Sequence, residues 1–174
     1  PYRPDFYTVT MVPTPEGLVV WAYSRQGPPG LWRLRPGDRT WSPLPHGDEL
    51  PRPVVDLTGA VHDSRRDRLL FFGLGDDGIG WIAACNHATG KVSSLAATGA
   101  EEVAGTERGE VIFRESVYLP RDDVVLVGAT GRIYDCVKDA WFKASIPSDE
   151  PEITKEGPYN IGVVHDPNRD LVWA

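Results

Sequence analysis

The stretch TGAVHDSRRDRLLFFG, residues 58–73, is closely repeated as IGVVHDPNRDLVWA at residues 161–174. In both, His-Asp is followed by three residues and a second Asp, and an apolar run begins one or two residues later. Asp, Asn and Pro favour tight turns, and two short apolar runs around such a turn are typical of a β-hairpin. The recurrence therefore predicts a chain built from similar hairpins.

Two further copies of this pattern occur, TVTMVPTPEGLVVWA at residues 8–22 and RESVYLPRDDVVLVG at residues 114–128. The residue before the second apolar run is Gly17, Asp67, Asp123 or Asp170, at intervals of about 50 residues. Residues 30–45, 80–96 and 131–147 add a second strand-turn-strand pattern to the first three copies. A complete unit is therefore expected to hold four strands, and repeats of this length are found in propellers.

These four-stranded units resemble the kelch repeat, which forms the blade of kelch propellers and of the galactose oxidase propeller. In that repeat an apolar strand ends in glycine, and an aromatic residue is separated by six others from a tryptophan. Tyr134 and Trp141 have this spacing, and Arg114 stands where the family often carries an arginine on its innermost strand. The chain departs from the family where a Gly-Gly pair is reduced to Gly73 or Gly128.

The resemblance implies an all-β fold, a kelch-like β-propeller with about three and a half blades in one partial domain over residues 1–174. The expected blades cover residues 6–45, 56–96 and 111–147, and half of a fourth covers residues 159–174. Propellers close with roughly four to eight blades. We therefore expect either a fragment of a longer chain with the remaining blades, or a second copy that closes the ring.

Composition bears on the class of partner. The formal net charge is -7, whereas nucleic-acid binders need a basic surface. The longest apolar runs, such as residues 69–72 and 124–127, are far shorter than the roughly 20 residues of a membrane span. We expect neither a nucleic-acid nor a membrane partner, and the cellular compartment stays open.

Acidic residues concentrate in the expected connections between blades, at residues 45–55, 96–110 and 147–158. Loops held by a rigid scaffold often carry function, so this face is a candidate surface for a protein or a small ligand, with ordinary solvated acidity as the alternative. The candidate partner-binding residues are Glu101, Glu102, Glu107, Glu150 and Glu152. Their spacing is not that of cation ligands, so neither a metal site nor a cofactor is predicted.

A second candidate surface is the mouth of the expected central channel, where the innermost strands begin. Its candidate ligand-binding residues are Asp56, Arg114, Glu115, Tyr159 and Asn160. Charges near the axis need partners or water. A structural network between neighbouring blades is the alternative to a ligand site.

The residues around the hairpin turns are assigned structural roles. Asp63 and Asp166 are expected to accept hydrogen bonds from backbone amides ahead of them. His62 and His165 occupy a repeat position that holds Val12 and Tyr118 in the other copies, which indicates packing beside a turn, with a role in a site as the alternative. The tryptophans are expected to pack in the core rather than to form a carbohydrate-stacking surface.

No catalytic motif stands out in the sequence, and the four histidines are dispersed along it. Nothing matches the copper site of galactose oxidase, so that chemistry is not carried over. The leading hypothesis is a non-enzymatic binding or scaffold module that presents an acidic loop face to a protein or ligand. The alternative is a fragment of a propeller enzyme acting on a carbohydrate or a small metabolite, and the enzyme question stays open.

Overall fold

The computed structural model describes residues 6–24, 27–45, 59–74, 80–99, 116–127, 132–143, 164–166, 168–169 and 171–173. These residues form strands and turns and contain no helix. The strands build three four-stranded antiparallel sheets and one two-stranded hairpin, and none of these sheets closes on itself. The expected all-β class with four-stranded units is confirmed. None of the described segments is a helix that could cross a membrane.

Within each sheet the strands pair in chain order. The first sheet holds β1 (Phe6–Thr14), β2 (Gly17–Ser24), β3 (Gly27–Leu34) and β4 (Ser42–Leu44). The second holds β5 (Gly59–Asp63), β6 (Arg68–Leu74), β7 (Gly80–Cys85) and β8 (Val92–Leu95). The third holds β9 (Ser116–Leu119), β10 (Val124–Val127), β11 (Arg132–Asp135) and β12 (Ala140–Lys143), and the hairpin is β13 (Val164–Asp166) with β14 (Leu171–Trp173).

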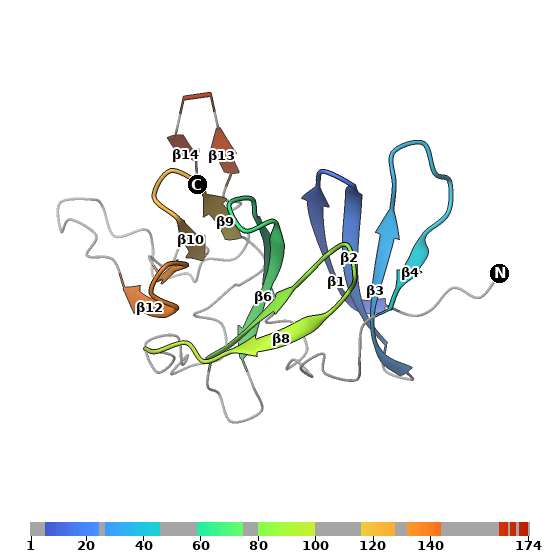
Figure 1. Cartoon of the computed structure of the whole chain (residues 1–174), viewed down its shortest axis with the longest axis horizontal. Coiled ribbons are helices and arrows are strands. Elements are labelled where there is room, and N and C mark those ends of the chain that lie inside the picture. The colour runs from blue at the N-terminus through green and yellow to red at the C-terminus, as the bar shows by residue number, and fades with distance from the viewer. Residues whose placement is uncertain are drawn as a thin grey trace, which may run out of the picture.

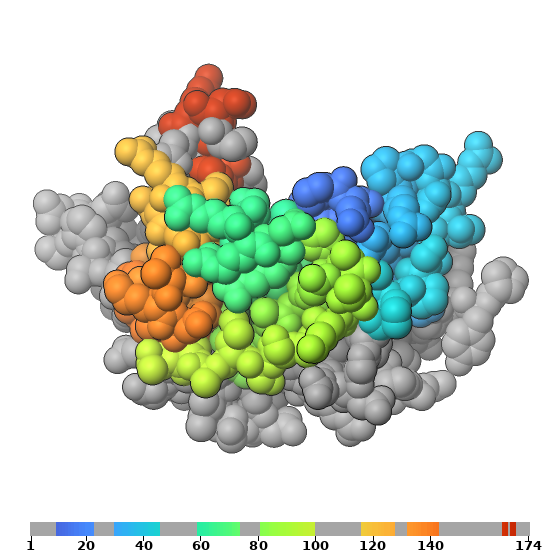
Figure 2. All heavy atoms as spheres, viewed as in Figure 1, coloured from blue at the N-terminus to red at the C-terminus, as the bar shows by residue number. Residues whose placement is uncertain are grey.

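The sheets are joined through their first strands. β1 contacts β5, β5 contacts β9, and β9 contacts β13. Figure 1 shows the three sheets side by side in chain order, with the β13–β14 hairpin beside the third. In the space-filling view the second sheet, green, packs directly between the first, blue, and the third, yellow to orange (Figure 2). The turns between β1 and β2, β5 and β6, and β9 and β10 thus belong to equivalent hairpins.

Backbone conformation explains the residue that precedes the second strand of each hairpin. Gly17, Asp67 and Asp123 have φ values of 126°, 49° and 58°. Positive φ is accessible to glycine and is tolerated by Asp and Asn better than by other residues. The recurring Gly or Asp is therefore the residue that lets the chain reverse into the second strand.

The seven-residue spacing between Tyr134 and Trp141 reflects the pairing of two neighbouring strands. Tyr134 lies opposite Trp141 across β11 and β12, and Cys85 lies opposite Val92 across β7 and β8. The rings of Tyr134 and Trp141 are in contact, with centroids 5.0 Å apart. The spacing thus marks the second hairpin of the second and third units, whichever side chains occupy it.

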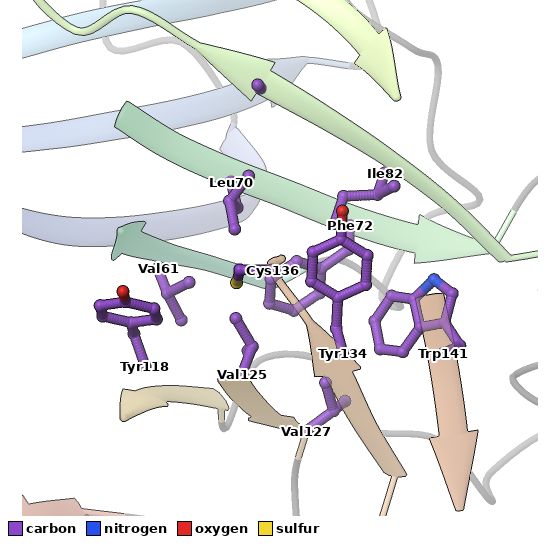
Figure 3. Packing of buried hydrophobic residues seen from close by; sticks show 11 residues of the cluster. Val61, Leu70, Phe72, Ile82, Tyr118, Val125, Val127, Tyr134, Cys136 and Trp141 are labelled. Atoms are coloured by element: carbon purple, nitrogen blue, oxygen red, sulfur yellow. The ribbon is translucent and has the colours of Figure 1, made fainter. Parts of the chain in front are cut away.

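Burial of the second sheet on both faces explains its apolar run. Side chains alternate across a strand, and all four residues of Leu69–Phe72 are at most 1% exposed. Leu69 and Phe71 pack toward the first sheet, while Leu70 and Phe72 pack toward the third. Figure 3 shows Phe72 with Tyr134 and Trp141 in the second of these cores. A strand covered on both sides needs a continuous apolar run rather than an alternating one.

The predicted core role of the tryptophans is correct for some of them. Trp21 is 3% exposed and Trp141 is 4% exposed, and Trp81 packs against the core between the first two sheets. Trp41 is 41% exposed, so the prediction is wrong there. Trp41 follows the turn after β3 and precedes the three-residue β4, so it lies outside the paired strands.

Candidate functional site

The residues that the sequence pattern nominated lie outside the part of the chain that the structure describes. This holds for the channel-mouth residues Asp56, Arg114, Glu115, Tyr159 and Asn160. It holds equally for the acidic loop residues Glu101, Glu102, Glu107, Glu150 and Glu152. The described polar groups instead cluster at the hairpin turns, at the end of the sheets where the β5–β6, β7–β8 and β9–β10 turns meet.

The β5–β6 and β13–β14 turns have the predicted aspartate geometry. Oδ1 of Asp63 accepts hydrogen bonds from the backbone N–H groups of Arg65 and Arg66, both at 3.2 Å. Oδ1 of Asp166 accepts the corresponding bonds from Asn168 at 2.9 Å and Arg169 at 3.3 Å. The predicted role of these aspartates is therefore confirmed. Each first aspartate holds the turn closed from its beginning.

In the β5–β6, β9–β10 and β11–β12 turns, an aspartate closes the turn from its far end. Asp67, Asp123 and Asp139 all have positive φ, and each contacts the side chain five positions earlier. The contacts are His62 Nε2 to Asp67 Oδ1 at 3.1 Å, Tyr118 Oη to Asp123 Oδ1 at 2.8 Å, and Tyr134 Oη to Asp139 Oδ1 at 2.6 Å. His62 therefore does more than pack beside its turn, because it is a polar partner of the turn aspartate.

An ion-pair network joins the β5–β6 turn to the β9–β10 turn. Nη1 and Nη2 of Arg66 each lie 2.8 Å from a different carboxylate oxygen of Asp123. Nη1 of Arg66 also donates to Oδ2 of Asp63 at 3.1 Å, and Nε of Arg68 donates to the same oxygen at 2.9 Å. Both carboxylates are buried, whereas the Arg66 side chain is 32% exposed. Two-point pairs of this kind fix orientation as well as charge.

The network holds its charges over a wide pH range. Hydrogen bonds from Arg66 lower the pKa of Asp123 to about 2. Burial acts to raise the pKa of Asp63, but hydrogen bonds from Arg68 and Arg66 outweigh it and the pKa lies below the usual value. Burial and the bond to Asp123 raise the pKa of Tyr118 far above its usual value. None of these three groups exchanges protons near neutral pH, so the network suits a structural role.

A separate cluster forms where the β5–β6 turn meets the β7–β8 turn. Nε2 of His87 lies 2.9 Å from Oδ1 of Asp67, the same oxygen that His62 contacts. The His87 side chain is 3% exposed, His62 is 14% exposed and Asp67 is 68% exposed. Hydrogen bonds from His87 and His62 lower the pKa of Asp67. The three donor atoms lie within 4.8 Å of one another, which is close enough for all of them to ligate one metal ion.

The cluster is connected to the first sheet by Arg33 of β3, which is 5% exposed. Its guanidinium donates to a carboxylate oxygen of Glu16 and to the backbone carbonyl of His87. Burial of the Arg33 charge is thus compensated by a carboxylate and a carbonyl. The contact ties the backbone at His87 to the first sheet and limits the positions that its ring can take.

A groove of about 340 Å³ runs across the first strands of the three sheets. Its walls include Thr10, Met11, Pro13, His62, Ser116 and Tyr118. Met11 is 60% exposed, which is a high value for a large apolar side chain. His62 borders both this groove and the histidine cluster, so the two features are adjacent.

Sequence reasoning treated the histidines as dispersed and did not bring His62 and His87 together. The contact of His62 with Asp67 has a signal in the sequence, because Tyr118 with Asp123 and Tyr134 with Asp139 repeat the same five-residue spacing. The approach of His87, and the pairing of Arg66 with Asp123, depend on how neighbouring hairpins pack. A single hairpin pattern contains no information on either contact.

Comparison with known protein families, with curated protein sequences and with solved structures finds no match to this chain.

Proposed function

We propose that this chain is a non-enzymatic binding or scaffold module built on kelch-like propeller blades, and that a small ligand binds in the groove over β1, β5 and β9. The groove carries the proposal. Its volume of about 340 Å³ lies within the range of about 300–1,000 Å³ that small-molecule sites occupy. It draws walls from three sheets, so a ligand there would contact several repeats at once.

The propeller part of the proposal rests on how the sheets adjoin. Four-stranded antiparallel sheets that touch through their first strands are what radial repetition produces. Completion of a ring, by further blades or by a second copy, stays a prediction. Native mass spectrometry, compared with the denatured mass, measures both the length of the chain and its association.

The groove combines two kinds of contact. β1 and β5 are edge strands, so each has one backbone edge that does not pair within its own sheet. Thr10 and His62 add polar side chains, and Met11 adds an adaptable apolar surface. We therefore propose a ligand that combines hydrogen-bonding groups with an apolar part.

The chain offers a direct probe of this groove, because Met11 is its one methionine. Methyl-labelled methionine gives a single NMR resonance, and soluble fragments that enter the groove should shift it. Fragments that shift it should bind Met11→Ala more weakly and should bind Leu18→Ala normally, since Leu18 is an exposed residue of β2 that does not line the groove. If the fragments bind Met11→Ala as tightly as they bind the unmodified chain, the groove is not their binding site.

The acidic connections remain a proposed surface for a basic partner. Ten acidic residues against three basic ones in these segments account for the net charge of the chain. An oligolysine peptide is a suitable probe, with binding expected to weaken as salt rises. Replacing Glu101, Glu102, Glu150 and Glu152 by Gln should weaken this binding, whereas Asp122→Asn in the β9–β10 turn should not. Equal binding by the two variants would contradict a specific acidic surface.

A further inference from the structure

We propose that His62, Asp67 and His87 form a binding site for one divalent first-row transition metal ion of the zinc type. The site goes beyond the proposed groove, and nothing in the spacing of these residues suggested it. Its three ligands come from the end of β5, from the β5–β6 turn and from the β7–β8 turn. The tertiary structure is what brings them together.

Convergence of the donor atoms carries the proposal. Nε2 of His62 and Nε2 of His87 point at the same carboxylate oxygen, at 3.1 Å and 2.9 Å. The two rings meet edge to face, with centroids 5.5 Å apart and an interplanar angle of 81°. The three donor atoms lie within 4.8 Å of one another, so one metal ion placed between them would be within reach of all three.

The surroundings hold the ligands in place without metal. His87 follows Asn86, whose Oδ1 accepts hydrogen bonds from the backbone N–H groups of Ala88 and Thr89, both at 3.0 Å. Arg33 holds the carbonyl of His87 from the side of the first sheet. Asp67 is placed by a turn with positive φ. The cost of ordering these side chains is therefore largely met by the fold itself, which favours binding.

Donor chemistry selects the class of ion. Imidazole nitrogen suits Zn²⁺, Cu²⁺ and Ni²⁺, while Mg²⁺ and Ca²⁺ prefer oxygen ligands. Three protein ligands, one of them 68% exposed, leave at least one coordination position open to solvent or to a further ligand. The site thus has the composition of an open site rather than of a closed structural zinc site.

One feature of the site limits its affinity. An imidazole that binds metal through Nε2 carries its proton on Nδ1, and metal-bound histidines almost always donate that proton to a partner. Nδ1 of His87 is buried and has no hydrogen-bond partner among the residues that the structure describes. Loss of such outer partners typically weakens metal binding by about 10- to 100-fold. We therefore expect reversible binding that is weaker than in a fully supported zinc site.

Isothermal titration calorimetry of the whole chain with ZnCl₂, under a non-thiol reductant, tests the proposal. The unmodified chain should bind one Zn²⁺ and should not bind Mg²⁺. His62→Tyr is the informative variant, because Tyr118 already makes the equivalent contact with its turn aspartate and the fold should be kept. It should lower zinc affinity by more than the roughly 10- to 100-fold that is typical for loss of an outer partner. Asp67→Asn should do the same, because Asn tolerates positive φ and keeps the turn.

The matched control is His165→Tyr, at the same repeat position in the β13–β14 hairpin, which should bind zinc like the unmodified chain. Thermal melts of all four proteins verify that each is folded, and ¹⁵N spectra of the histidine rings should show coordination through Nε2. The proposal is overturned if the unmodified chain binds no zinc. It is overturned equally if folded His62→Tyr and Asp67→Asn bind as tightly as His165→Tyr, in which case the cluster is a hydrogen-bonded turn alone.

Discussion

Arg66 and Asp123 form a two-point ion pair that joins the second sheet to the third, with both nitrogen–oxygen distances at 2.8 Å. Arg66 lies in the β5–β6 turn, and Asp123 is the residue with positive φ that ends the β9–β10 turn. The turns of these two hairpins thus also connect the second sheet to the third. Changes at these turns should therefore affect packing between sheets as well as the turns themselves.

Removing the Arg66 side of the pair should destabilise the protein. Arg66→Gln removes the two-point partner of the buried Asp123 carboxylate, and it leaves the buried Asp63 carboxylate with Arg68 as its ion-pair partner. We expect the free energy of unfolding to fall by about 2–3 kcal/mol, measured by urea titration. Arg169→Gln is the control. The Arg169 side chain is 72% exposed, and its Nε lies as far as 3.8 Å from Oδ2 of Asp166, so its loss should cost less than about 1 kcal/mol. Equal effects of the two variants would contradict a network that joins the sheets.

Stability should depend on acid pH through Asp123. Arg66 lowers the pKa of Asp123 to about 2 in the folded protein, below the value of 3.8 for the free side chain. The stabilisation of about 2 kcal/mol is therefore present above pH 4 and is lost as the pH falls from 4 to 2. Unfolding of the unmodified chain and of Asp123→Asn, compared at each pH, should differ most near pH 6 and converge toward pH 2. A gap that stays constant over this range would contradict the assignment.

The hydroxyl of Tyr118 should contribute measurably to the same network. Tyr118→Phe keeps the buried ring and removes the 2.8 Å bond to Asp123. We expect a loss of about 1 kcal/mol in the free energy of unfolding. Because the bond to Tyr118 helps to lower the pKa of Asp123, the acid transition should also move to higher pH. A variant with unchanged stability and an unchanged acid transition would show that the hydroxyl is dispensable.

The glycine that ends the first hairpin turn should tolerate no side chain. Gly17 has a φ of 126°, and an added Cβ would collide with the backbone carbonyl of Leu34. Gly17→Ala should lower the free energy of unfolding by more than about 2 kcal/mol. Gly37 also has positive φ, at 87°, but has open space around it, so Gly37→Ala should cost only about 1 kcal/mol. Similar costs at the two sites would mean that the close approach to Leu34 is absent in solution.

The two cysteines should be inert in the folded protein. Cys85 and Cys136 are buried and free, and burial raises the pKa of each thiol to about 12. The thiolate is the reactive form, so a thiol reagent at pH 8 should label neither residue until urea unfolds the chain. Labelling of the folded chain at the rate of an exposed cysteine would show that the cores open readily.

Local pattern was sufficient for the hairpins. Turn residues such as Asp63 act on amides two and three positions ahead, and strand pairing across a short turn follows from its length. The all-β class, the four-stranded units and the two aspartate turns could therefore be predicted. The candidate site residues could not be tested in the same way, because all ten lie outside the described part of the chain.

The sequence pattern of a single hairpin could not predict the contacts between hairpins. His62 meets His87 because two hairpins of the second sheet bring their turns together at one end, and Arg66 meets Asp123 because the second and third sheets adjoin there. Turn formation depends on backbone geometry over a few residues, which the amino acids themselves specify. Packing between hairpins depends on the whole apolar face of each sheet, and the polar contacts at the turns follow from that packing.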